Sequence, residues 1–114
     1  MKSMFIVLNK TEKLNELLRC FSEHKIYGGT ILESQGMAAS LIQSGDTSGI
    51  YLRLNSLLNQ GRPFNKTLMM VLRDEQVTTV RQCIDEVLGD MHKHNMGIVF
   101  TVPVDDWDGI VKED

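Results

Sequence analysis

The sequence has few of the residues that mark disulfide-rich, metal-binding or fibrous domains. It holds two cysteines and two prolines in 114 residues, and its hydrophobic and charged fractions, 42% and 24%, are ordinary for a globular chain. Two cysteines make no disulfide scaffold, and Cys20 and Cys83 are too far apart in the chain for a metal knuckle. Both fall in helical patterns, so we expect them to be reduced, small core residues of a cytosolic protein.

Long apolar runs and runs of positive charge are also absent. No apolar stretch reaches the roughly 18–20 residues that a membrane-spanning helix needs, and the first residues lack the layout of a signal peptide. The net charge is −3 and the basic residues are scattered, which argues against a nucleic-acid-binding face. We therefore expect a single cytoplasmic domain over residues 1–114, with neither membrane insertion nor a nucleic-acid partner.

What the sequence does contain is three short stretches that would be apolar on both sides of an extended strand: residues 4–8, 66–72 and 98–102. Successive side chains of a strand point to opposite faces of a sheet. These three strands should therefore be covered on both faces. A fourth stretch, residues 30–34, is shorter and more polar, and Glu33 within it favours an edge position.

Two stretches show the spacing of amphipathic helices. Residues 11–24 repeat apolar side chains at helical intervals, with Thr11 as the expected N-cap, and residues 74–88 do the same, with Asp74 as the expected cap and Gly89 as the stop. The apolar positions are Leu14, Leu17, Leu18 and Phe21 in the first helix and Val77, Val80, Ile84, Val87 and Leu88 in the second. A shorter stripe at Ile50, Leu54, Leu57 and Leu58 predicts a helix over residues 50–60.

The order of these elements predicts an α+β fold, a ferredoxin-like βαββαβ sandwich with a short helical insert between the second and third strands. Right-handed crossovers would place both long helices on one face, with the first and third strands central. The other face would then expose a large apolar patch, which a monomer rarely does. This favours symmetric self-association of the chain.

Motifs for chemistry are few. No nucleophile–base or acid–base pair stands out, so we expect no enzyme. His92 and His94 flank Lys93 in what we interpret as an exposed polar turn, and we assign His24 a structural role at a helix end. Residues 105–114 form an acidic tail, whose carboxylates we expect to be solvated and which could alternatively bind a hard cation.

Four stretches together resemble nitrogen-regulatory PII proteins, specifically a divergent PII-like branch. They are VLNKTEK at 7–13, GTILESQGM at 29–37, RPFNKT at 62–67 and GIVFTVPVD at 97–105, and the resemblance runs over nearly the whole chain. It implies a compact homotrimer of ferredoxin-like subunits with the three sheets facing inward. It also implies a signalling protein that binds ATP or ADP between subunits, often with 2-oxoglutarate, and that regulates targets through a long loop, here residues 36–62.

The chain departs from the family at its phosphate-binding positions. The family's loop opens with Gly-x-Gly followed by a basic residue, and of these only the first glycine, Gly36, is present here. The family has Gly-Lys before the last strand, whereas here Gly97 is followed by Ile98. Aspartates stand where the family has arginines after the last strand. A triphosphate needs positive charge and backbone donors. We therefore do not expect ordinary ATP binding. The sequence requires no cofactor and leaves a nucleotide open as a ligand.

The leading hypothesis is thus a PII-like regulator that senses a small ligand at the cleft between subunits, binds a partner protein through residues 36–62, or does both. The expected ligand-binding residues are Gly36, Met37, Lys66 and Gly97, and the expected partner-binding stripe is Tyr51, Leu54 and Leu58. The alternative is a metal-binding trimer similar to CutA proteins, in which His92, His94 and the tail residues Asp105, Asp106 and Asp108 would meet across subunits.

Overall fold

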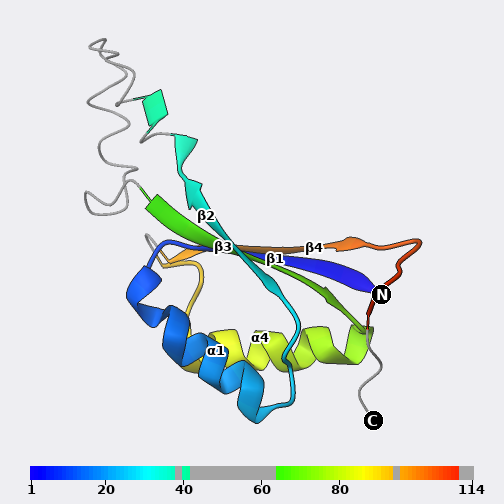
Figure 1. Cartoon of the computed structure of the whole chain (residues 1–114). Coiled ribbons are helices and arrows are strands. Elements are labelled where there is room, and N and C mark those ends of the chain that lie inside the picture. The colour runs from blue at the N-terminus through cyan, green and yellow to red at the C-terminus, as the bar shows by residue number, and fades with distance from the viewer. Residues whose placement is uncertain (38–39, 42–63, 94–95, 111–114) are drawn as a thin grey trace.

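The computed structural model describes residues 1–37, 40–41, 64–93 and 96–110. Their elements form a mixed α+β fold in which the α-helices lie on one face of an antiparallel sheet (Figure 1). The elements in chain order are β1 (Lys2–Leu8), the 3₁₀ turn η1 (Thr11–Lys13), α1 (Leu14–Glu23), β2 (Thr30–Gln35), β3 (Phe64–Leu72), α4 (Asp74–Leu88) and β4 (Gly97–Pro103). The helix predicted over residues 50–60 lies outside the described residues.

The sheet has four strands in the order β2-β3-β1-β4, and each neighbouring pair is antiparallel. The predictions that the first and third strands are central and that the second is an edge are therefore confirmed. In the register of the sheet, Phe5 lies opposite Met69 on one side and Phe100 on the other. Leu8 lies opposite Lys66 and Gly97 in the same way.

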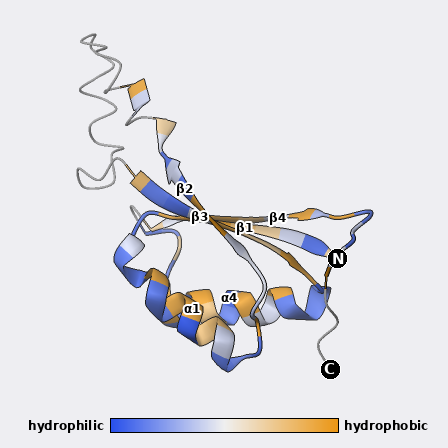
Figure 2. Ribbon diagram, viewed as in Figure 1, coloured by the Kyte–Doolittle hydropathy of each residue, from blue (hydrophilic) through white to orange (hydrophobic). Residues whose placement is uncertain are grey.

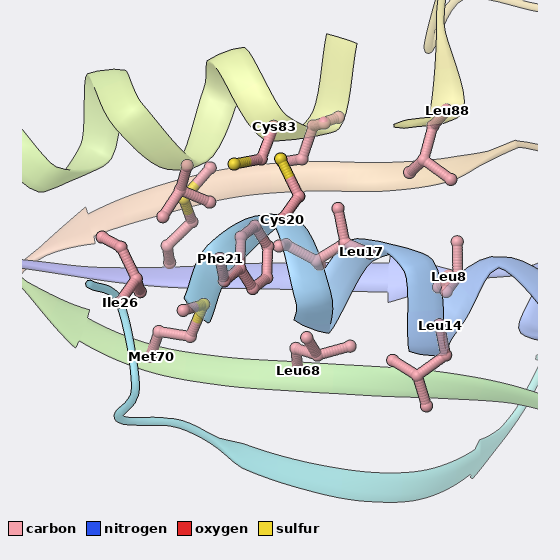
Figure 3. Packing of buried hydrophobic residues seen from close by; sticks show 14 of the residues in the cluster. Leu8, Leu14, Leu17, Cys20, Phe21, Ile26, Leu68, Met70, Cys83 and Leu88 are labelled. Atoms are coloured by element: carbon pink, nitrogen blue, oxygen red, sulfur yellow. The ribbon is translucent and has the colours of Figure 1, made fainter. Parts of the chain in front are cut away.

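The core fills the space between the two helices and the sheet (Figures 2 and 3). Each helix turns one apolar stripe toward the sheet, as its sequence pattern predicts. The buried residues are Leu14, Leu17, Cys20 and Phe21 from α1, Val80, Cys83, Ile84 and Leu88 from α4, Met4, Ile6 and Leu8 from β1, and Leu68, Met70 and Leu72 from β3. Within the described ranges, no helix combines the length and the apolar character needed to cross a membrane.

Both predicted N-caps are wrong, although the helices themselves are present. Thr11 begins the 3₁₀ turn, so α1 starts only after Lys13 and the Thr11 hydroxyl comes too early to cap it. Asp74 is the first residue of α4, and the cap is Arg73, whose backbone N–H donates to Gln76 Oε1 at 2.9 Å. A carboxylate in the first turn still suits the positive end of a helix. The predicted stop is confirmed, since Gly89 follows α4 with a φ of 76°.

Candidate functional site

The face of the sheet opposite the helices is apolar and open. No helix of the described residues lies over it (Figure 1). Strand alternation places on this face the exposed apolar side chains of Leu32, Met69, Val71, Ile98, Phe100 and Val102. At its centre the rings of Phe5 and Phe100 stack with centroids 4.9 Å apart. We call this surface the outer face.

The outer face confirms that β1, β3 and β4 carry apolar side chains on both sides. Ile98 is 62% exposed and Phe100 43% exposed, and their neighbours across the strands are apolar as well. Contiguous apolar patches of this kind mark binding surfaces. The outer face is therefore a feature of the described structure that calls for a partner.

The four predicted ligand-binding residues lie toward one end of the sheet. Lys66 and Gly97 flank Leu8 on opposite sides of β1. Gly36 directly follows β2 at that same end, and the side chain of Met37 beside it is 76% exposed. The strands thus bring these residues to one end, but Lys66 and Gly97 belong to strands that do not neighbour each other.

Lys66 is already engaged by a carboxylate. Its Nζ lies 2.5 Å from Oε1 of Glu33, the residue directly opposite on β2. This ion pair is on the helix side of the sheet by alternation, at the end of the hairpin that projects away from the helices (Figure 1). Glu33 therefore offsets the charge that Lys66 could present to an anion.

Gly97 has a structural reason to be glycine. Its φ is 137°, and a Cβ at this position would lie 2.0 Å from the carbonyl oxygen of Val7 in β1. The close approach of β4 to β1 thus excludes any larger residue there. Gly36 differs, because a Cβ there would meet no described atom within 4 Å.

A row of polar side chains crosses the same end of the outer face. The Ser34 hydroxyl hydrogen-bonds Asn65 Oδ1 and lies 2.8 Å from the Thr67 hydroxyl, while Asn65 Nδ2 donates to Asn9 Oδ1 at 3.5 Å. We call Asn9, Ser34, Asn65 and Thr67 the polar row. The polar row was not predicted from the sequence, although β3 changes from polar residues at 65 and 67 to apolar residues at 69 and 71, and this change signals it.

The remaining predicted residues are only partly described. Tyr51, Leu54, Leu58 and His94 lie outside the described residues. The His92 backbone N–H donates to Asp90 Oδ1 at 2.9 Å, and Asp105, Asp106 and Asp108 are exposed. Within the described part of one chain these histidine and aspartate side chains form no three-residue cluster of metal-ligating atoms, so the CutA-like alternative stays a prediction.

A second cluster lies between the helices, away from the outer face. The metal-ligating atoms of Cys20, His24 and Cys83 all lie within 4.8 Å of one another. Both thiols are free and buried, as the sequence predicts. Burial, together with hydrogen bonding to Cys83 and Glu86, raises the pKa of the Cys20 thiol to about 12. This cluster was not predicted from the sequence, although the spacing of four residues between Cys20 and His24 places both on one side of a helix and could have indicated it.

An apolar cavity of about 300 Å³ opens where α1 ends and β2 begins. Leu18, Phe21, Ile31 and Met70 line it together with the exposed side chain of Tyr27. It adjoins the start of β2, whereas Gly36 follows the end of that strand. The cavity is therefore separate from the predicted ligand-binding residues.

Comparison with models of known protein families gave no match, and no curated protein sequence matches the chain either. The function is therefore argued from the outer face, the polar row and the order of the elements.

Proposed function

We propose that the chain is a cytoplasmic PII-like signalling protein that works as a homotrimer. Each ferredoxin-like subunit would turn its outer face inward, sense a small ligand between subunits and contact a partner protein through residues 36–62. The element order and the sheet order β2-β3-β1-β4 agree with the ferredoxin-like βαββαβ plan. The observation that carries the proposal is the open apolar outer face.

The outer face supports assembly because covering it removes apolar surface from water. A fully buried apolar side chain is worth roughly 1.5–3 kcal/mol relative to an exposed one. Ile98 is 62% exposed, so most of that gain is still available there. The stacked Phe5 and Phe100 rings give the face a flat, rigid centre on which a second copy could pack.

The polar row supports a ligand site at the margin of that assembly. It lies where the outer face changes from apolar to polar, beside the end of β2 that leads to Gly36. Hydroxyl and amide groups grouped at the rim of an apolar surface suit recognition of a small polar molecule. Because none of the four side chains of the polar row carries a charge, the site favours a ligand less charged than a triphosphate.

Assembly is tested by light scattering on the purified chain, with one charged substitution on each side of the molecule. We expect a mass three times the 12.9 kDa of one chain. Ile98→Glu places a carboxylate on the outer face and should give a folded monomer, because Ile98 is largely exposed within the subunit. Gln82→Glu adds the same charge to an exposed position of α4 and should leave the trimer intact. A monomeric parent chain would overturn the proposal.

Ligand sensing is tested by thermal shift with ADP, ATP, 2-oxoglutarate, cyclic dinucleotides and bicarbonate, each added separately. Ligand at 100 times its dissociation constant adds about 2.7 kcal/mol of stability. Gly36→Val is the suitable site variant because a Cβ at position 36 meets no described atom within 4 Å, whereas a larger residue at Gly97 would disrupt the β1–β4 pairing. We expect a shift with one of the smaller ligands that Gly36→Val abolishes. A trimer that responds to none of them would refute the sensing role while leaving the assembly.

A further inference from the structure

The cluster between α1 and α4 is not used by the proposed function. Cys20 and His24 lie four residues apart at the end of α1, and Cys83 and Glu86 lie three residues apart on α4. These spacings put each pair on one side of its helix. The Cys20 and Cys83 side chains lie near each other where the two helices pack together, with their sulfurs within 4.8 Å (Figure 3). Three side chains that commonly bind metals therefore converge from two elements, and the Glu86 carboxylate lies beside the sulfur of one of them, Cys20.

Their spacing is close to that of ligands around one zinc ion. Zn–S bonds of about 2.3 Å and Zn–N bonds of about 2.0 Å place tetrahedral ligand atoms roughly 3.4–3.8 Å apart. The His24 Nδ1 lies 3.6 Å from the Cys83 sulfur, and Glu86 Oε2 lies 3.2 Å from the Cys20 sulfur. All three atoms of the Cys20, His24 and Cys83 set lie within 4.8 Å of one another.

The position of each ligand also suits metal entry and retention. The two thiols are buried, so a bound ion would be shielded from water on the side of the core. His24 and Glu86 are exposed and leave a path from solvent. In the absence of an ion, His24 Nδ1 lies 2.8 Å from the carbonyl oxygen of Cys20, where an Nδ1–H donates to that oxygen and holds the ring beside the sulfur atoms.

We propose that Cys20, His24 and Cys83 bind one Zn²⁺ ion, with the Glu86 carboxylate as the fourth ligand. Binding releases the two thiol protons to solvent. The His24 imidazole gives up its hydrogen bond to the Cys20 carbonyl oxygen and binds the ion through Nδ1 in its neutral form, with its proton on Nε2. Thiolate and imidazole ligands select zinc over magnesium or calcium, which prefer oxygen. The ion would tie the end of α1 to the middle of α4.

The proposal is tested with Co²⁺ on the full chain, reduced and freed of metal. Tetrahedral thiolate coordination gives a thiolate-to-cobalt charge-transfer band together with intense visible bands, and Zn²⁺ displaces the cobalt. We expect one Co²⁺ per chain. His24→Gln and Cys83→Ser should abolish the charge-transfer band or weaken binding more than tenfold, and Glu86→Gln should weaken it about tenfold. His92→Gln replaces an exposed histidine outside the cluster and should change nothing.

The variants separate a metal site from a packing role. His24 is exposed, so His24→Gln should fold even where Cys83→Ser, in the core, does not. A reduced, folded chain that shows no charge-transfer band with Co²⁺ would overturn the proposal, and so would a Co²⁺ affinity that His24→Gln leaves unchanged. Formation of a Cys20–Cys83 disulfide in air by a chain that binds no Co²⁺ when reduced would assign the two thiols a redox role instead and overturn it as well.

Discussion

The two faces of one sheet differ in what covers them and hardly at all in the kind of residue they carry. On the helix side, Met4, Ile6 and Leu8 have no exposed surface. On the outer face, Phe5 lies between Met4 and Ile6 in β1 and stacks on Phe100 of β4. This aromatic pair is still partly open to water. The same strands thus supply a finished core on one side and an uncovered apolar layer on the other.

This comparison shows what strand patterning does and does not specify. A strand that is apolar on both sides calls for a layer on each face of the sheet. Right-handed crossovers put both long helices on the same face, so the described residues supply only one of the two layers. The pattern therefore states that a second layer is needed without stating whether the same chain or another copy provides it.

The largest expected difference between the two faces is in the free energy of unfolding that is lost when an isoleucine on each face is replaced by alanine. Ile6→Ala removes a fully buried side chain and should lower the free energy of unfolding by about 2–5 kcal/mol. Because the helix-side core lies within one chain, the loss should be the same at every protein concentration. Urea unfolding at several concentrations measures it.

Ile98→Ala is the matched change on the outer face. It should cost less within a subunit, because Ile98 is 62% exposed, and its loss should grow with protein concentration if a second copy covers the face. Equal losses for both variants at every concentration would contradict the distinction between the two faces.

Most of the fold could be predicted from the sequence because it depends on local periodicity. The apolar stripe of α4 and the stop at Gly89 appear as expected, and so does the edge position of the strand that bears Glu33. The first residue of each helix was predicted less accurately. A 3₁₀ turn occupies Thr11–Lys13, so α1 begins only at Leu14. Formation of this turn depends on the geometry of the chain after β1.

The candidate sites were harder to predict because they depend on distances between elements. Lys66 was expected to bind a ligand, but register places it opposite Glu33, which no single strand pattern shows. Cys20 and Cys83 are far apart in the sequence and meet only through the packing of α1 against α4. The spacing of residues in the sequence shows which side chains share one face of a helix or strand. Predicting a site also requires knowing which helices and strands pack against each other.

A smaller effect concerns the aromatic pair at the centre of the outer face. Phe5 and Phe100 stack with an interplanar angle of 14°, and such pairs contribute about 0.5–1.5 kcal/mol beyond their buried area. A double-mutant cycle of Phe5→Ala and Phe100→Ala measures this coupling. Performing it in the Ile98→Glu background removes the contribution of assembly. A coupling near zero there would mean that the outer face is organised only when a second copy covers it.

The smallest effect comes from the ion pair at the uncovered end of the helix side. The Lys66 side chain is 29% exposed and the Glu33 side chain 75% exposed, so water screens the pair and a coupling of about 0.2–1 kcal/mol is expected. A double-mutant cycle of Lys66→Ala and Glu33→Ala, followed by urea unfolding, measures it, and high salt should reduce it further. Leu8, opposite Lys66 on the neighbouring strand, is fully buried, so the boundary of the core falls between adjacent strands. A coupling well above 1 kcal/mol that salt leaves unchanged would mean that the Lys66–Glu33 pair is shielded from water. The buried core would then extend to this end of β2 and β3.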